Sequence, residues 1–187
     1  MAKLDRPSAH AYVVRTMAKL PILVAPDSRL KTKAKPVAQV DDRIRRLTED
    51  MLETMYDAPG IGLAAPQIGI LERIVVIDVA GKDEPRAPMR LINPEITWVS
   101  EDLQTAEEGC LSLPEQWAEV VRPAEVKVRY LDETGARQEK HATGLLAVCL
   151  QHEIDHLDGV LFVDHLSALR RNMILKKVQK WKKDHVS

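Results

Sequence analysis

The sequence has few aromatic residues, few cysteines and no long apolar run, and each shortage excludes a class of protein. It holds three Trp, three Tyr and one Phe, too few for the base-stacking surfaces of nucleic-acid-binding modules. Its two cysteines cannot form the disulfide framework of a small secreted scaffold. Its longest stretch without a charged side chain, residues 58–71, spans 14 positions, whereas a bilayer-spanning helix needs roughly 18 apolar residues. We therefore expect a globular protein that does not cross a membrane.

What remains is an ordinary composition with an uneven distribution of charge. The 187 residues are 45% hydrophobic and 29% charged, which is typical of one domain with its own core. We expect residues 1–20 to form a flexible extension and residues 21–187 to form a single domain. Residues 166–187 carry a net charge of +6, and the rest of the chain carries −7. The basic segment either meets an anionic partner or forms a solvated helix face.

Apolar spacing predicts three helices. The first begins at Asp41 or Asp42, because either side chain suits the N-cap position. The second spans residues 145–157 and is ended by Gly159. The third begins at about Ser167. We expect it to present one apolar stripe, made of Leu169, Met173, Ile174, Val178 and Trp181.

Alternating and β-branched residues predict the strands. We expect them at residues 73–80, 90–100, 125–131 and 137–142. A turn at residues 132–135 joins the last two into a hairpin, and Pro94 marks an edge or a bend. The strands precede the second helix without regular alternation of strand and helix. This order favours an α+β fold with mostly antiparallel pairing.

The most informative segment is His152-Glu-Ile-Asp-His156. Histidines at positions i and i+4 face the same side of a helix, so both imidazoles can bind one cation. Glu153 is placed to contact a metal-bound water instead of the metal itself. The alternative is a pair of surface histidines, which is weakened because the helix is strongly apolar and a buried imidazole needs a partner.

A catalytic site of this kind takes three protein ligands and leaves one position open. Two third ligands known from zinc endoproteases are absent from this sequence. No Glu follows Glu153 in the sequence, and Phe162 stands where a metzincin has its third histidine. The third ligand therefore has to come from elsewhere in the chain.

The two cysteines are the candidates for that ligand. Cys149 would lie about 10.5 Å from His156 along the helix, at 1.5 Å per residue, so we expect it to line a pocket. Cys110 stands in a loop-like segment between Gly109 and Pro114. It is either the third ligand, delivered by a loop that folds over the helix, or a small buried apolar side chain.

A third segment, Gly60-Ile-Gly-Leu-Ala-Ala-Pro-Gln67, combines small residues with one amide. Its glycines allow the backbone to approach another group closely, and Gln67 could donate a hydrogen bond to a developing oxyanion. It lacks the Lys-Ser/Thr and the glycine spacing of nucleotide-binding loops. The alternative is an ordinary turn after a helix.

Taken together, this segment, Glu108-Gly-Cys-Leu-Ser112 and Gln151-His-Glu-Ile-Asp-His156 resemble the three signature motifs of peptide deformylase, in that family's order. The similarity runs from about Pro21 to Lys180. The resemblance implies an α+β fold in which antiparallel β-sheets surround a central HExxH metal-binding helix, with a further helix at the C-terminus. It also implies hydrolytic removal of the formyl group from the N-terminal formylmethionine of new polypeptides, with release of formate.

The resemblance assigns roles to the motif residues. Cys110, His152 and His156 would hold one divalent metal ion, with Fe2+ the usual ion and Zn2+, Ni2+ or Co2+ able to replace it. Glu153 would take a proton from the metal-bound water and pass it to the leaving amine. The Gln67 amide would stabilise the oxyanion together with the metal and a backbone N–H.

That N–H belongs to Leu111, and the resemblance also implies a backbone contact from Gly62 to the substrate. The other substrate-binding residues that we expect are Ile61, Gly109, Trp117, Leu145, Val148 and Cys149. Trp117 stands where many bacterial members carry Arg, so an apolar contact would replace a polar one. Arg122 is a candidate partner for Glu108 that would brace the Cys110 segment. The alternative is an ordinary surface ion pair.

The resemblance also suggests a role for the basic C-terminal segment. The resemblance implies that bacterial deformylases use a C-terminal helix to dock near the ribosomal exit tunnel, where formylated chains emerge. We therefore expect residues 166–187 to contact ribosomal RNA phosphates without reading a base sequence. The corresponding location is the bacterial cytoplasm, with an organelle as the alternative.

Overall fold

The computed structural model describes residues 19–185. In chain order the 3-10 helices (η), α-helices and strands are η1 (Ser28–Lys31), α1 (Asp42–Asp57), β1 (Gly62–Ala64), η2 (Ala65–Ile68), β2 (Ile74–Ile77), β3 (Met89–Val99), β4 (Leu103–Cys110), β5 (Leu113–Pro123), β6 (Glu125–Leu131), β7 (Arg137–Thr143), α2 (Gly144–Leu157), η3 (Phe162–His165) and α3 (Ala168–His185). Within this part of the chain, no helix has the length and apolar character that a membrane span requires.

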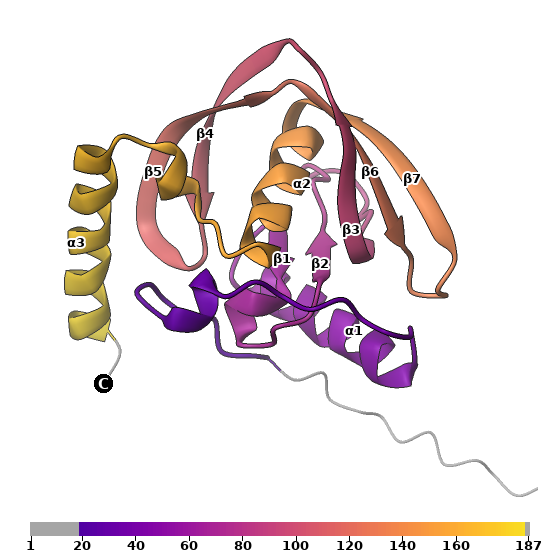
Figure 1. Cartoon of the computed structure of the whole chain (residues 1–187). Coiled ribbons are helices and arrows are strands. Elements are labelled where there is room, and N and C mark those ends of the chain that lie inside the picture. Colours follow the sequence, from indigo (N-terminus) through magenta and orange to yellow (C-terminus); the bar gives the residue numbers. More distant parts are fainter. Residues whose placement is uncertain (1–18, 186–187) are drawn as a thin grey trace, which may run out of the picture.

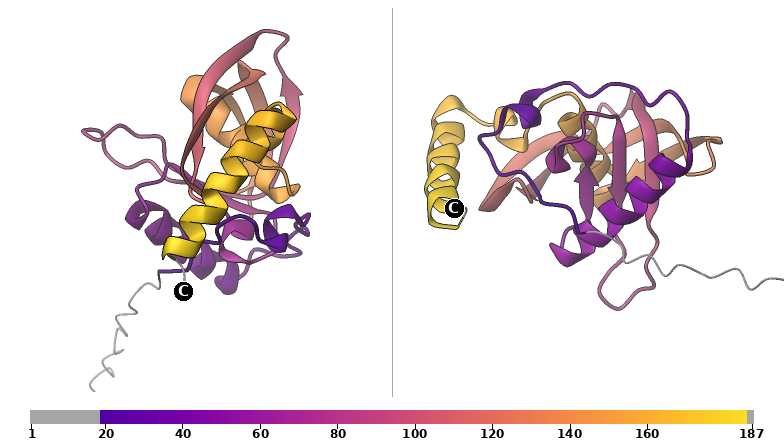
Figure 2. Two further views of the ribbon diagram at one scale, coloured as in Figure 1. Left: turned by 90° about the vertical axis from the view of Figure 1, so that its left-hand side faces the viewer. Right: turned by 90° about the horizontal axis from the view of Figure 1, so that it is seen from below.

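Two antiparallel sheets enclose the helix α2. The larger sheet has the strand order β1-β2-β3-β6-β7, and β4 pairs with β5 in the smaller one. Figure 1 shows α2 between the two sheets, with α1 below them. Helix α3 runs along the outer side of β5 (Figure 2), far from the larger sheet. The expected α+β arrangement around a central helix is confirmed.

Local sequence signals explain where the helices begin and end. Asp41 is the N-cap of α1, and its side chain accepts a hydrogen bond from the Ile44 N–H at 3.0 Å. After α2 the chain turns at Gly159, whose φ is +75°. A Cβ on Gly159 would lie 2.6 Å from the Lys31 carbonyl oxygen. Glycine is therefore required there both for the backbone conformation and for space.

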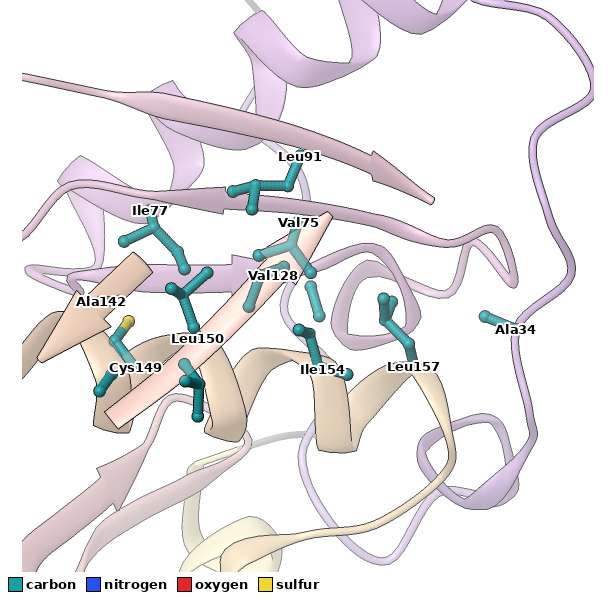
Figure 3. Close-up of a cluster of buried hydrophobic side chains, with 13 residues drawn as sticks. Ala34, Val75, Ile77, Leu91, Val128, Ala142, Cys149, Leu150, Ile154 and Leu157 are labelled. Carbon is teal, nitrogen blue, oxygen red and sulfur yellow. The ribbon is translucent and has the colours of Figure 1, made fainter. Parts of the chain in front are cut away.

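One face of α2 packs on the larger sheet and forms the main core. Figure 3 shows Leu150, Ile154 and Leu157 of α2 directed toward Val75, Ile77, Leu91 and Val128 of the sheet. Each of these seven side chains is buried, and full burial of one such side chain stabilises the fold by roughly 1.5–3 kcal/mol. This packing fixes the rotation of α2 about its axis. The histidine face of the same helix consequently turns away from the larger sheet.

The three expected helices and four expected strands are present, with ends shifted by a few residues. Residues 125–131 and 137–143 form the expected hairpin. The register of β3 against β6 shifts between Ile92 and Glu95, so Pro94 lies at an irregularity of the strand as predicted. The expected extension, residues 1–20, lies outside the described residues except for Lys19 and Leu20.

Two expectations are wrong. Residues 103–123, which include the expected loop at Cys110, form the β4–β5 hairpin, with Cys110 at the end of β4. Their sequence is rich in Glu and Gln, which hides the strand pattern. The expected stripe of α3 is also incomplete: Ile174 and Val178 are buried, whereas Leu169 is 73% and Met173 54% exposed. Because α3 packs mainly on β5 and η3, the covered part of its surface is narrower than the expected stripe.

Candidate functional site

Three potential metal ligands meet where α2 faces the β4–β5 hairpin. The ligand atoms of Cys110, His152 and His156 all lie within 4.8 Å of one another. The Cys110 Sγ is 3.3 Å from the His156 Nε2. Both histidines are buried, and neither imidazole could stay there without a polar partner except at a cost in free energy. One thiolate and two imidazoles are a donor set that suits Zn2+ or Fe2+, so these residues fit a metal ion.

A buried ion pair holds one of these histidines. The Nδ1 of His152 lies 2.8 Å from Oε2 of Glu108. Arg122 binds both carboxylate oxygens of Glu108, at 2.5 Å through Nε and 3.0 Å through Nη2. The expected contact between Arg122 and Glu108 is therefore present. Burial opposes the charge, yet the hydrogen bonds from His152 and Arg122 lower the pKa of Glu108 to about 2.

The second residue of the motif, Glu153, lies beside the three potential ligands. Its side chain is buried, and its Oε2 has no hydrogen-bond partner within residues 19–185. Burial raises the pKa of Glu153 to about 7, because the charged carboxylate is poorly solvated. A carboxyl group with this pKa can both accept and release a proton near neutral pH.

The glycine-rich segment reaches this carboxylate. A Cβ on Gly62 would contact the carboxylate of Glu153 and lie 2.9 Å from the Cys149 Sγ, so only glycine lets β1 approach α2 this closely. The Gln67 Nε2 lies 3.2 Å from the Ser112 Oγ and 3.6 Å from the Cys110 Sγ. The other end of this amide accepts a hydrogen bond from the backbone of β1. The Gln67 amide is thereby directed at the metal-ligand cluster.

A cavity of about 520 Å³ opens above these residues. It lies between the Gly60–Gly62 segment, the first turns of α2 and the end of the β4–β5 hairpin. Its wall includes Ile61, Val148 and Leu113, so it suits an apolar side chain. Burial raises the pKa of the Cys149 thiol well above its ordinary value, so this side chain stays neutral in the wall.

Comparisons with known proteins agree with this geometry. The sequence profile of the polypeptide deformylase family matches residues 19–172. A peptide deformylase from Methylocella silvestris is 58% identical over 163 residues, which are 86% of this chain and 83% of the relative.

The chain belongs to the peptide deformylase family.

Solved structures extend the agreement to three dimensions. The peptide deformylase from Ehrlichia chaffeensis superposes with a TM-score of 0.86 at 39% identity and covers 91% of this chain and 100% of its own. The same enzyme has also been solved with actinonin, with a TM-score of 0.85. The plant peptide deformylase PDF1B gives a TM-score of 0.83 at 37% identity, over 92% of this chain and 94% of its own. The deformylase is thus a metalloenzyme that releases formate from formyl-Met peptides.

The structure brings the residues expected from the three motifs to one place. Apart from His156, which lies deeper, the residues named for catalysis, substrate and metal line the cavity: Ile61, Gly62, Gln67, Gly109, Cys110, Leu111, Trp117, Leu145, Val148, Cys149, His152 and Glu153. Trp117 is 64% exposed and lies across the backbone of Gly109. Leu145 stands at the exposed rim.

Sequence reasoning did not identify four residues around this deformylase site. Ser112 contacts Gln67, Asp155 contacts Arg122, and Phe162 stacks on His152, with ring centroids 6.2 Å apart. His165 contacts Asp155. Asp155 could have been found, because it lies three positions after His152 and so on a neighbouring part of the same helix face. The other three depend on tertiary packing.

Proposed function

We propose that this deformylase holds one divalent metal ion with Cys110, His152 and His156, and that the ion is Fe2+. The convergence of these three side chains beside a buried carboxylate carries the proposal. Zn2+, Ni2+ and Co2+ accept the same ligands. When bound, the metal ion would lower the pKa of a coordinated water and polarise the formyl carbonyl.

Glu153 is the general base in this proposal. It takes the proton of the attacking water and later gives it to the leaving amine of the peptide. Its burial supports the first step, because a poorly solvated carboxylate binds a proton more readily than one in water. The close approach of Gly62 keeps the carboxylate at the edge of the cavity. Glu153 therefore acts as a proton carrier and not as a ligand.

Gln67 and the backbone N–H of Leu111 stabilise the negative charge that develops on the formyl oxygen. The Gln67 amide is held at both ends, by Ser112 and by the backbone of Ala64. A donor that is already oriented needs no reorganisation when the charge forms, which lowers the barrier most effectively in a buried site.

The methionine side chain of the substrate packs against the apolar wall of the cavity, which is formed by Ile61, Leu145, Val148 and Cys149. Gly62 and Gly109 offer their backbones to the peptide on either side of the cavity. Trp117 covers the peptide beyond the methionine with an apolar surface, because its indole lies exposed at the rim. The expected preference is for formyl-Met peptides followed by apolar residues.

The decisive test compares formate release with general proteolysis. The anaerobically purified protein, with its metal content measured, is given formyl-Met-Ala-Ser and, separately, casein. We expect stoichiometric metal, formate from the tripeptide and no cleavage of casein. Casein cleavage without formate would contradict the proposal, and an enzyme that is fully active in air with stoichiometric zinc would contradict Fe2+.

The basic helix α3 is the proposed ribosome contact, and the bacterial cytoplasm is the proposed location. Lys176, Lys177, Lys180 and Lys183 are exposed on α3. Clustered cations attract RNA phosphates in a salt-dependent manner. The bacterial relatives support the location.

A further inference from the structure

A chain of hydrogen bonds runs from the buried His152 to the surface. His152 contacts Glu108, and Glu108 is bound by Arg122. The Arg122 Nη1 lies 2.9 Å from the Asp155 Oδ2. The Nε2 of His165 lies 2.8 Å from the same Oδ2. The side chain of Arg122 is 5% exposed, whereas that of His165 is 36% exposed.

The geometry of Arg122 explains why the chain continues past Glu108. A guanidinium has five N–H donors in one plane. Glu108 accepts from Nε and Nη2, and Asp155 accepts from Nη1. Carboxylates on two sides thus fix both the position and the plane of the buried cation. An error in the orientation of this plane would pass to Glu108 and from there to the ring of His152.

Asp155 itself needs a second support. Its side chain is 26% exposed, so it can turn toward water and leave Arg122. His165, the last residue of η3, prevents this by holding the oxygen that Arg122 uses. The first residue of η3, Phe162, stacks on His152 with an interplanar angle of 23°. The short helix η3 is therefore attached to the metal-ligand region at both of its ends.

We propose that His165 is a positioning residue for the metal centre, acting through Asp155 and Arg122 on Glu108 and His152. This inference rests on the proposed ligand set. Residues that orient a metal ligand typically change metal affinity or activity by about 10–100-fold when removed. His165 acts through two further side chains, so we expect a smaller effect, of about 3–10-fold on metal retention.

The test measures the loss of Co2+ from the loaded protein to EDTA, with the visible absorption of Co2+ as a report of ligand geometry. The variants are His165→Ala, His165→Gln, which keeps a donor, and His141→Ala. His141 is a matched control because it also pairs with a carboxylate, Glu125, at 2.6 Å, but between β7 and β6 of the larger sheet. We expect about 3–10-fold faster loss for His165→Ala and near wild-type rates for the other two.

A double-mutant cycle tests the route of the effect. In an Asp155→Asn background, His165→Ala should add less than about twofold, because the two residues act through one connection. Three results would overturn the positioning role. His165→Ala could retain Co2+ as well as the wild type, or it could speed Co2+ loss equally in the Asp155→Asn background. His165→Gln could also lose Co2+ as fast as His165→Ala. A fall in the melting temperature of the metal-free variant that accounts for the faster loss would also overturn it. A wild-type protein that binds no Co2+ would instead refute the ligand set.

Discussion

Oε2 of Glu108 lies 2.8 Å from Nδ1 of His152. An ionised carboxylate can only accept, so Nδ1 carries the proton and Nε2 is left free for a cation. The Nδ1 of His156 has no hydrogen-bond partner within residues 19–185. The two histidines of one motif are therefore held differently: a carboxylate orients His152 through Nδ1, whereas the contact of His156 within residues 19–185 is at Nε2, with the Cys110 Sγ.

Replacing Glu153 by Ala should separate metal binding from turnover. We expect metal content near that of the wild type and a turnover at least about a hundredfold lower, as for the loss of a general base. Elemental analysis and formate release on the same preparation give both values. Loss of the metal would mean that Glu153 is a ligand and that the proposed role is wrong.

The two cysteines should respond differently to the same change. Cys110→Ser should retain the metal ion much more weakly, because a hydroxyl is a poorer ligand than a thiolate. Cys149→Ser should keep the metal and mainly raise KM for formyl-Met peptides, since a polar atom is placed in the apolar wall. Metal retention and KM are measured on both variants. If Cys110→Ser keeps the metal and Cys149→Ser loses it, Cys149 is the ligand and Cys110 lines the pocket.

The buried carboxyl group of Glu153 should make the stability of the metal-free protein depend on pH. Its pKa is about 7 in the folded state, against an ordinary value of 4.5. The folded state thus prefers the proton, and stability present below pH 4.5 is lost as the pH rises through about 7.

The metal-free Glu153→Gln variant should not lose stability in this way, because glutamine does not titrate. Relative to the metal-free wild type, we expect it to gain up to about 3 kcal/mol between pH 4 and pH 8. Urea unfolding of both proteins at the two pH values measures the difference. If the stability difference between them is the same at pH 4 and pH 8, folding does not raise the pKa of Glu153.

The ribosome proposal predicts a charge effect that leaves catalysis unchanged. Replacing Lys176, Lys177, Lys180 and Lys183 by Gln should lower co-sedimentation with ribosomes at low salt, because four phosphate-binding charges are lost. Lys182 is kept, because its Nζ lies 3.1 Å from the Val24 carbonyl oxygen and helps to hold α3.

The control for this experiment replaces the same four lysines by Arg, which keeps the charge. Both variants should hydrolyse a free formylated tripeptide at the wild-type rate. Persistent co-sedimentation of the Gln variant would refute the docking role. A loss of tripeptide activity would show that α3 supports the site, a connection for which Trp181 and Glu115 offer a contact at 3.3 Å.

Local patterns in the sequence determined much of this protein. The N-cap at Asp41, the turn at Gly159 and the hairpin at residues 125–143 follow from short-range preferences of the backbone. The i, i+4 spacing places His152 and His156 on one helix face. These features need only a few neighbouring residues, so they can be predicted before any tertiary contact is known.

Only the tertiary structure decided how distant segments complete the site. The resemblance to a known family pointed to Cys110 and to an Arg122–Glu108 pair, but only the register of β4 against β5 shows how Cys110 reaches α2 and how Arg122 comes to bind Glu108. The attachment of His165 to Asp155 and the exposure of Leu169 depend on where η3 and α3 pack. These outcomes depend on contacts between segments far apart in the chain, and helical or strand periodicity carries no information about which segment a given face will meet.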